Sequence, residues 1–176
     1  MKIEYNMIDN YKTIYNESMG IFRDIKKIKT NDKYKLRTLI QTEIVRFSLY
    51  LLESIIFFIL YFVLDKFLLF LIFSIIMLVV TFVYYFSLYC LYKEACGVDR
   101  SGTIEINKEG IWDYSESNKI FLSWENFDCV VIGKHSVTFV LLKIKTFMSM
   151  PIEKEKELLK ALNKYNPNLK IIDKRK

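Results

Sequence analysis

The sequence contains few of the residues from which catalytic and metal sites are usually built. It has one histidine, three cysteines and five glycines in 176 residues. No CxxC pair, phosphate-binding glycine loop, GxSxG motif or HExxH motif occurs. Cys90, Cys96 and Cys129 together with His135 make no convincing zinc site. We therefore predict that the protein is not an enzyme and has no metal or cofactor.

The only histidine lies in a short polar turn. His135 stands beside Ser136 between two apolar runs. To act as a base, it would need a nucleophile and an orienting acid from elsewhere in the chain. We expect an ordinary solvent-exposed turn residue.

Two long apolar runs occupy the middle of the chain. Residues 45–64 and 67–92 are separated by Asp65 and Lys66, and the second run contains no charged residue. Twenty helical residues at about 1.5 Å each cross a hydrocarbon core of about 30 Å. We predict a transmembrane helical hairpin over residues 44–92, with helices at 44–64 and 67–92.

The basic residues predict the orientation of this hairpin. Ten lysines and arginines precede residue 47 and fifteen follow residue 92, whereas Lys66 alone lies at the turn. Because positive flanks stay inside, both termini should be cytoplasmic. Heavy use of Lys, Ile, Asn, Tyr and Phe suggests a bacterial genome of low GC content. The expected location is therefore a bacterial plasma membrane.

Glu53 is the one ionisable side chain well inside a predicted span. The hairpin should place it opposite residues 77–81, which makes Thr81 a candidate hydrogen-bond partner. Arg46, seven residues earlier on roughly the same face, could draw the carboxylate toward the headgroups. Such residues often have a functional role because hydrocarbon is a costly place for them. The alternative is a glutamate that only packs the hairpin.

From residue 101 the hydrophobic pattern changes from long runs to alternation. Strands are expected at residues 103–107, 111–115, 119–124, 127–132, 137–142 and 144–150, separated by polar turns. Residues 153–165 carry a helical apolar stripe that should pack on the sheet. The predicted class is an α+β membrane protein. Its antiparallel β domain, residues 101–170, would resemble a small pleckstrin-homology-like roll with a C-terminal helix, before a basic tail at 171–176.

The first 43 residues should form a cytoplasmic strand and an amphipathic helix. Residues 2–7 alternate, and residues 9–29 carry an apolar stripe at helical spacing. We hypothesise that this segment and the C-terminal segment build one domain, into which the hairpin is inserted.

These features together resemble the YcxB-like family of bacterial membrane proteins. Within the tail, the similarity rests on Gly102-Thr103-Ile104, Gly110-Ile111 and Ser123-Trp124-Glu125-Asn126-Phe127. The resemblance implies a two-span anchor and a cytoplasmic pleckstrin-homology-like domain. The family has no established catalytic residues, so none is carried over to this chain.

Two groups of residues are candidates for binding. Trp112 and Tyr114 should share one face of a strand and could form an exposed aromatic patch for a partner, although core packing under the final helix is equally compatible with the pattern. Trp124 is expected in the core. A basic stretch precedes the first span and could attract anionic lipid, at about 1 kcal/mol per residue; it comprises Lys26, Lys27, Lys29, Lys33, Lys35 and Arg37.

The sequence therefore favours a non-enzymatic, membrane-anchored binding or regulatory protein. Its partner would be a protein or a lipid headgroup. Nucleic acid is not expected, although the net charge is +6, because no nucleic-acid-binding motif accompanies the charge. The alternative is an immunity protein that protects the cell against a membrane-active toxin or bacteriocin.

Overall fold

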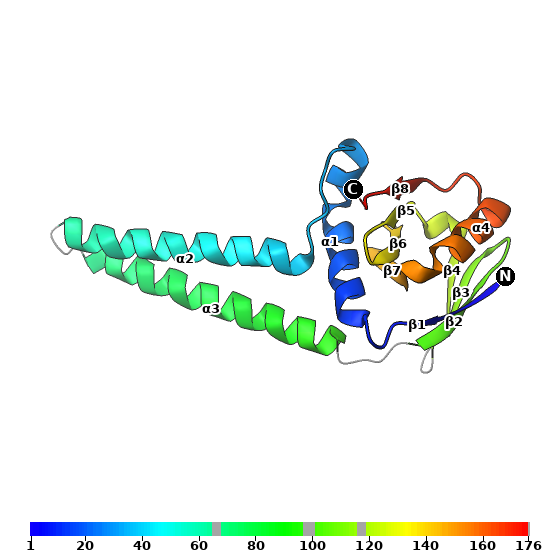
Figure 1. Ribbon diagram of the computed structural model, residues 1–176. Coiled ribbons are helices and arrows are strands. Elements are labelled where there is room, and N and C mark those ends of the chain that lie inside the picture. The colour runs from blue at the N-terminus through cyan, green and yellow to red at the C-terminus, as the bar shows by residue number, and fades with distance from the viewer. Residues whose placement is uncertain (65–67, 97–100, 116–118, 176) are drawn as a thin grey trace. The chain divides into compact units, whose positions relative to one another are not determined.

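The computed structural model describes residues 1–64, 68–96, 101–115 and 119–175, which form two compact units (Figure 1). One unit consists of Met1–Leu39 and Val98–Lys176, and the other of Ile40–Gly97. Both ends of the chain therefore belong to the same unit, which we call the domain. The predicted turns at residues 65–66 and 116–118 lie outside the described residues.

The middle unit is an antiparallel helical hairpin. It pairs α2 (Leu39–Val63) with α3 (Leu68–Cys96). Both helices are long and apolar enough to cross a membrane, over Leu39–Val63 and Leu68–Cys90. Most of their apolar side chains are exposed, and Ser54 is the only buried residue in α2. The helices are thus apolar on nearly every side, as expected of segments that hydrocarbon surrounds.

The first sheet of the domain combines both ends of the chain. Its order is β1-β2-β3-β4, and all neighbours are antiparallel. Strand β1 (Lys2–Asn6) pairs with β2 (Ser101–Ile106), so that Ile3 lies opposite Ile104. Strands β3 (Gly110–Ser115) and β4 (Lys119–Ser123) complete the sheet. The N-terminal strand thereby covers an edge of β2 that would otherwise be free.

The second sheet contains the most deeply buried strands. Its order is β7-β6-β5-β8, formed by β5 (Cys129–Ile132), β6 (Ser136–Leu141), β7 (Thr146–Pro151) and β8 (Ile171–Asp173). All residues of β5 and β6 are buried. The predicted meander therefore divides into two sheets. The prediction of residues 171–176 as a simple basic tail is wrong, because β8 pairs in parallel with β5.

Helix α1 (Tyr11–Thr30) lies along the second sheet (Figure 1). Its buried face includes Ile14, Ile21, Ile25 and Ile28, which recur at helical spacing. The phenyl ring of Phe22 lies 5.6 Å from that of Phe147 on β7. The helix that the sequence predicts is therefore present, and it packs against strands that lie more than a hundred residues later in the chain.

The C-terminal helix closes the main core of the domain. A short 3-10 turn, η2 (Ile152–Lys154), leads into α4 (Glu155–Tyr165), whose buried side chains are Leu158, Ala161 and Leu162. They join one cluster with β1, β2 and β6, which includes Ile3, Ile104 and Phe139. Trp124 lies in the 3-10 turn η1 (Trp124–Asn126), where it packs half-buried against this core. The predicted fold class, two long apolar helices with an antiparallel β unit and a C-terminal helix, is confirmed.

Candidate functional site

The candidate binding residues Trp112 and Tyr114 lie on the outer side of the first sheet. Successive residues of a strand point to opposite faces, so the fully buried Ile111 places Trp112 outside. Trp112 and Tyr114 are both half-buried. Their rings are stacked, with centroids 6.1 Å apart. The sequence left core packing as an alternative for these two residues, and their partial exposure favours the surface patch.

Strand β4 completes this cluster. Phe121 lies opposite Trp112, with ring centroids 4.7 Å apart, and Lys119 lies opposite Tyr114. The Lys119 ammonium is 4.8 Å from the centroid of the Trp112 ring and 5.1 Å from that of Tyr114. We call Trp112, Tyr114, Phe121 and Lys119 the aromatic face. It offers flat apolar rings and one positive charge to whatever lies against the sheet.

Charges of both signs border the aromatic face. Strand register places Glu105 opposite Trp112 on one side and opposite Lys2 on the other. Glu4 lies opposite Thr103 in the same two strands. Lys2 and Glu4 are exposed, and Glu105 is half-buried. The surrounding surface is therefore of mixed charge.

A groove of about 430 Å³ opens on the inner side of the same sheet. Its apolar lining includes Tyr11, Tyr15, Leu122 and Phe147, from α1, β4 and β7. Asp113, which lies between Trp112 and Tyr114 in β3, reaches this groove, and its Oδ1 accepts a hydrogen bond of 2.8 Å from the Tyr5 hydroxyl. Strand alternation could have predicted the inward direction of Asp113, but the pairing with Tyr5 depends on the long-range register of β1.

A buried acidic residue that the sequence did not indicate connects two parts of the domain. Glu17 of α1 is 7% exposed. Its carboxylate accepts hydrogen bonds from the backbone N–H groups of Lys134 and His135, at 2.8 and 2.9 Å, and from the Ser136 hydroxyl at 2.7 Å. A Cβ at Gly133 would lie 2.5 Å from the Glu17 carboxyl group. Glu17 therefore binds α1 to the β5–β6 turn, and the His135 side chain is exposed.

The polar contacts within the hairpin differ from those predicted. Ser54 donates to the Ser74 carbonyl and Ser74 donates to the Ser54 carbonyl, each at 3.0 Å. The predicted Glu53–Thr81 contact is wrong, because the Thr81 hydroxyl donates to the Met77 carbonyl of its own helix and Glu53 is exposed. Since adjacent helical residues point about 100° apart, burying Ser54 turns Glu53 away from α3.

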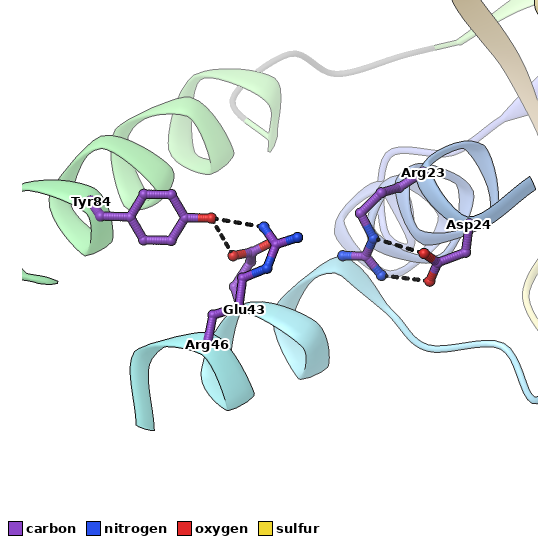
Figure 2. Close-up of polar contacts among 5 residues, drawn as sticks. All are labelled: Arg23, Asp24, Glu43, Arg46 and Tyr84. Atoms are coloured by element: carbon purple, nitrogen blue, oxygen red, sulfur yellow. Dashed lines mark hydrogen bonds and ion pairs between the residues drawn. The ribbon is translucent and has the colours of Figure 1, made fainter. Parts of the chain in front are cut away.

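Arg46 lies near the start of α2, where it forms a cluster with Glu43 and Tyr84. Its Nη1 lies 3.3 Å from Glu43 Oε1 and donates to the Tyr84 hydroxyl at 3.1 Å. Tyr84 in turn donates to Glu43 Oε2 at 2.6 Å (Figure 2). The prediction that Arg46 draws the Glu53 carboxylate toward the headgroups is wrong, since these contacts direct Arg46 to Glu43 and Tyr84.

The candidate lipid-binding residues divide into two groups. Lys29 forms an ion pair with Asp128 in the domain and is half-buried. The other candidates are exposed; they are Lys26, Lys27, Lys33, Lys35 and Arg37. Five of the six predicted positions therefore present their side chains to solvent.

The segment that carries these basic residues is fixed to the domain. Arg23 Nη2 donates to the Asp24 carboxylate at 2.9 Å (Figure 2). The Tyr34 hydroxyl donates to the same carboxylate at 2.8 Å. Burial acts to raise the pKa of Asp24, but these hydrogen bonds and nearby positive charges outweigh it, and the pKa lies below its ordinary value. Lys174 Nζ donates to the carbonyls of Asn31 and Asp32, at 3.0 and 2.7 Å.

No cluster of three or more His, Cys, Asp or Glu side chains with metal-binding geometry occurs in the described residues. Cys129 is fully buried in β5, and burial raises the pKa of its thiol to about 12. Cys129 is therefore a small core residue, as its apolar neighbours predict.

Comparison with protein-family models, with curated proteins and with solved structures gives no match. The geometry described above is therefore the basis for any functional proposal.

Proposed function

We propose that this chain is a non-enzymatic, membrane-anchored binding protein whose domain holds a protein partner against its aromatic face. The observation that carries the proposal is the cluster of Trp112, Tyr114, Phe121 and Lys119 on the outer side of the first sheet. Aromatic residues in contact at a surface supply large apolar area at a low cost in conformational entropy. They are enriched among the residues that dominate protein–protein affinity.

The hairpin supports the membrane part of the proposal. Its exposed apolar side chains extend along both helices, and water would disfavour so large a continuous surface. A bilayer accommodates that surface, and the basic flanks favour cytoplasmic termini at a bacterial plasma membrane. Only residues 97–100 separate α3 from β2, so the domain is tethered directly to its anchor.

A protein fits the aromatic face better than a lipid surface does. Glu4 and Glu105 share its side of the sheet with Lys2 and Lys119. Anionic headgroups would be repelled by these carboxylates, whereas a protein surface can present both signs in matching positions. Lipid contacts suit the five exposed basic residues before α2, because Asp32 is the only acidic residue between positions 26 and 37.

The resemblance to the YcxB-like family supports the same proposal. Such proteins would combine a two-span anchor with a pleckstrin-homology-like domain, and the two sheets and C-terminal helix of this domain are compatible with that plan. The resemblance supplies no binding residues, so the aromatic face is proposed from its own geometry.

The proposal is tested by site-specific photo-crosslinking of the full-length chain in its host membrane. A photoreactive phenylalanine replaces Phe121, which is 38% exposed, or Ile171 of the second sheet, which is 39% exposed. We expect a discrete protein adduct from position 121 and none from position 171. Trp112→Ala and Lys119→Glu should each reduce that adduct at least threefold. Equal adducts from both positions, or adducts with lipid alone, would overturn the proposal.

A further inference from the structure

The position of Glu53 in the hairpin raises the question of what covers its carboxyl group. Val63, the last residue of α2, lies ten positions after Glu53, so Glu53 is about 15 Å from that end of the helix. Half of a hydrocarbon core of about 30 Å is the same distance. In a bilayer, the carboxyl group would therefore lie near the midplane, on an exposed side of the helix.

Several other polar side chains of the hairpin form hydrogen bonds with groups other than Glu53. Ser54 and Ser74 bond reciprocally on the buried side, and the Thr81 hydroxyl donates to Met77. Arg46 contacts Glu43 and Tyr84. Lipid chains offer no hydrogen bond to a carboxyl group, whether it is charged or neutral. An ionisable side chain so placed is expected to find its partner on another membrane helix.

We propose that α2 packs against α2 of a second copy of this chain and that the two Glu53 carboxyl groups hydrogen-bond to each other across the interface. A carboxyl group that holds its proton has both a donor and an acceptor, so two of them are complementary to each other. Two copies insert with the same orientation, and a twofold axis parallel to the helices places residue 53 beside residue 53. This inference rests on the proposed membrane anchoring.

The side of α2 that carries Glu53 is suited to such contact. Leu49, Glu53, Ile56 and Leu60 recur at alternating spacings of four and three residues, the pattern by which parallel helices pack. Leu49 is 54% exposed and Ile56 is 46% exposed. We call these four residues the Glu53 stripe. Leu49, Glu53 and Ile56 are exposed and Leu60 is half-buried, so most of the stripe is accessible to a second copy.

Cysteine crosslinking in membranes tests the proposal with two matched pairs. Cys90 and Cys96 are first replaced by serine, and a single cysteine then replaces Leu49 or Ile56 in the stripe. The controls replace Leu51 or Phe58, which lie two residues later and so about 200° around the helix. Phe58, at 47% exposed, matches Ile56 in exposure and depth. We expect oxidation to give a disulfide-linked dimer at least fivefold more efficiently from the stripe than from the controls.

A second set of variants tests the carboxyl group itself. In the Ile56→Cys background, Glu53→Leu should reduce dimer formation at least threefold, whereas Glu53→Gln should retain most of it because an amide also donates and accepts. Equal crosslinking from stripe and control positions, an adduct of another mass, or no effect of Glu53→Leu would each overturn the proposal. Carbonate washing of the same membranes separates these outcomes from failure of the anchor, since an unanchored chain would leave the membrane fraction in every variant.

Discussion

Glu17 illustrates how one buried acid can connect distant parts of the chain. Its carboxylate satisfies two backbone N–H groups and one hydroxyl of the β5–β6 turn. We expect Glu17→Gln to lower the free energy of unfolding of the domain by about 2 kcal/mol, because the amide places a donor where donors already point. Urea denaturation in detergent measures this by tryptophan fluorescence, since both tryptophans lie in the domain. Glu4 is exposed, so Glu4→Gln should change the free energy of unfolding little. An equal loss from both substitutions would contradict a stabilising role for the Glu17 hydrogen bonds.

The lowered pKa of Asp24 predicts the sign of its contribution to stability as the pH changes. A carboxyl whose pKa is lowered by folding stabilises the protein above its unfolded pKa, and that stabilisation is lost as the pH falls through the folded value. The lowered pKa of Asp24 therefore predicts that Asp24→Asn lowers the melting temperature of the domain at pH 7. The difference in melting temperature between the wild-type and Asp24→Asn proteins should become smaller once the pH falls below about 3.9, the usual pKa of an aspartate. Melting curves between pH 3 and 7 measure it, and a difference that grows toward acid would contradict the prediction.

Cys129 should be chemically inert in the folded protein. Its pKa of about 12 leaves almost no thiolate at neutral pH, and its side chain is fully buried. In a Cys90→Ser, Cys96→Ser variant, we expect a maleimide at pH 7.5 to label the chain at least a hundredfold more slowly before than after denaturation in urea. Rapid labelling of the native protein would show that β5 is accessible.

At the scale of elements, the N-terminal strand contributes to a core that is otherwise C-terminal. Ile3 is 1% exposed and lies opposite the fully buried Ile104. Ile3→Ala should therefore lower the free energy of unfolding of the domain by about 3 kcal/mol, the usual cost of such a cavity. Lys2→Ala, on the exposed side of the same strand, is the control. The same urea titration measures both, and equal effects would mean that β1 does not pack as described.

The elements whose hydrophobic period is clear could be predicted from the sequence. The stripe of α1, the alternation of β2 and β3 and the long apolar runs of α2 and α3 all have local signatures. Strand β8 has none, because three residues after a short turn show no period, and its parallel pairing with β5 depends on the whole second sheet. The division of the strands into two sheets is likewise a property of long-range register.

The candidate site was predicted only in part, for a similar reason. Strand alternation put Trp112 and Tyr114 on one face, but Phe121 and Lys119 join them through the β3–β4 register. The sequence marks Glu53 as unusual, because it is a lone acidic residue in an apolar run. Its direction could not be predicted in an apolar helix with no polar face, and it follows from the Ser54–Ser74 contact.

At the scale of the whole molecule, the chain inserts its apolar hairpin into a domain made from both ends. Met1–Leu39 precedes the hairpin and Val98–Lys176 follows it, yet they share strands and a core. Such a domain can form only when both ends of the hairpin emerge on the same side of a membrane. The fold of the domain therefore requires that both ends of the hairpin lie on one side of the membrane. That the hairpin crosses the membrane in this way is the central claim of this account.

Labelling of intact cells with a charged, membrane-impermeant maleimide tests that claim most directly. In the Cys90→Ser, Cys96→Ser background, a cysteine replaces Leu64 at the end of the hairpin or Lys164 near the end of α4. We predict that position 64 is labelled from outside the cell and that position 164 is labelled only after lysis. Labelling of position 164 in intact cells, or protection of position 64 until lysis, would contradict the account.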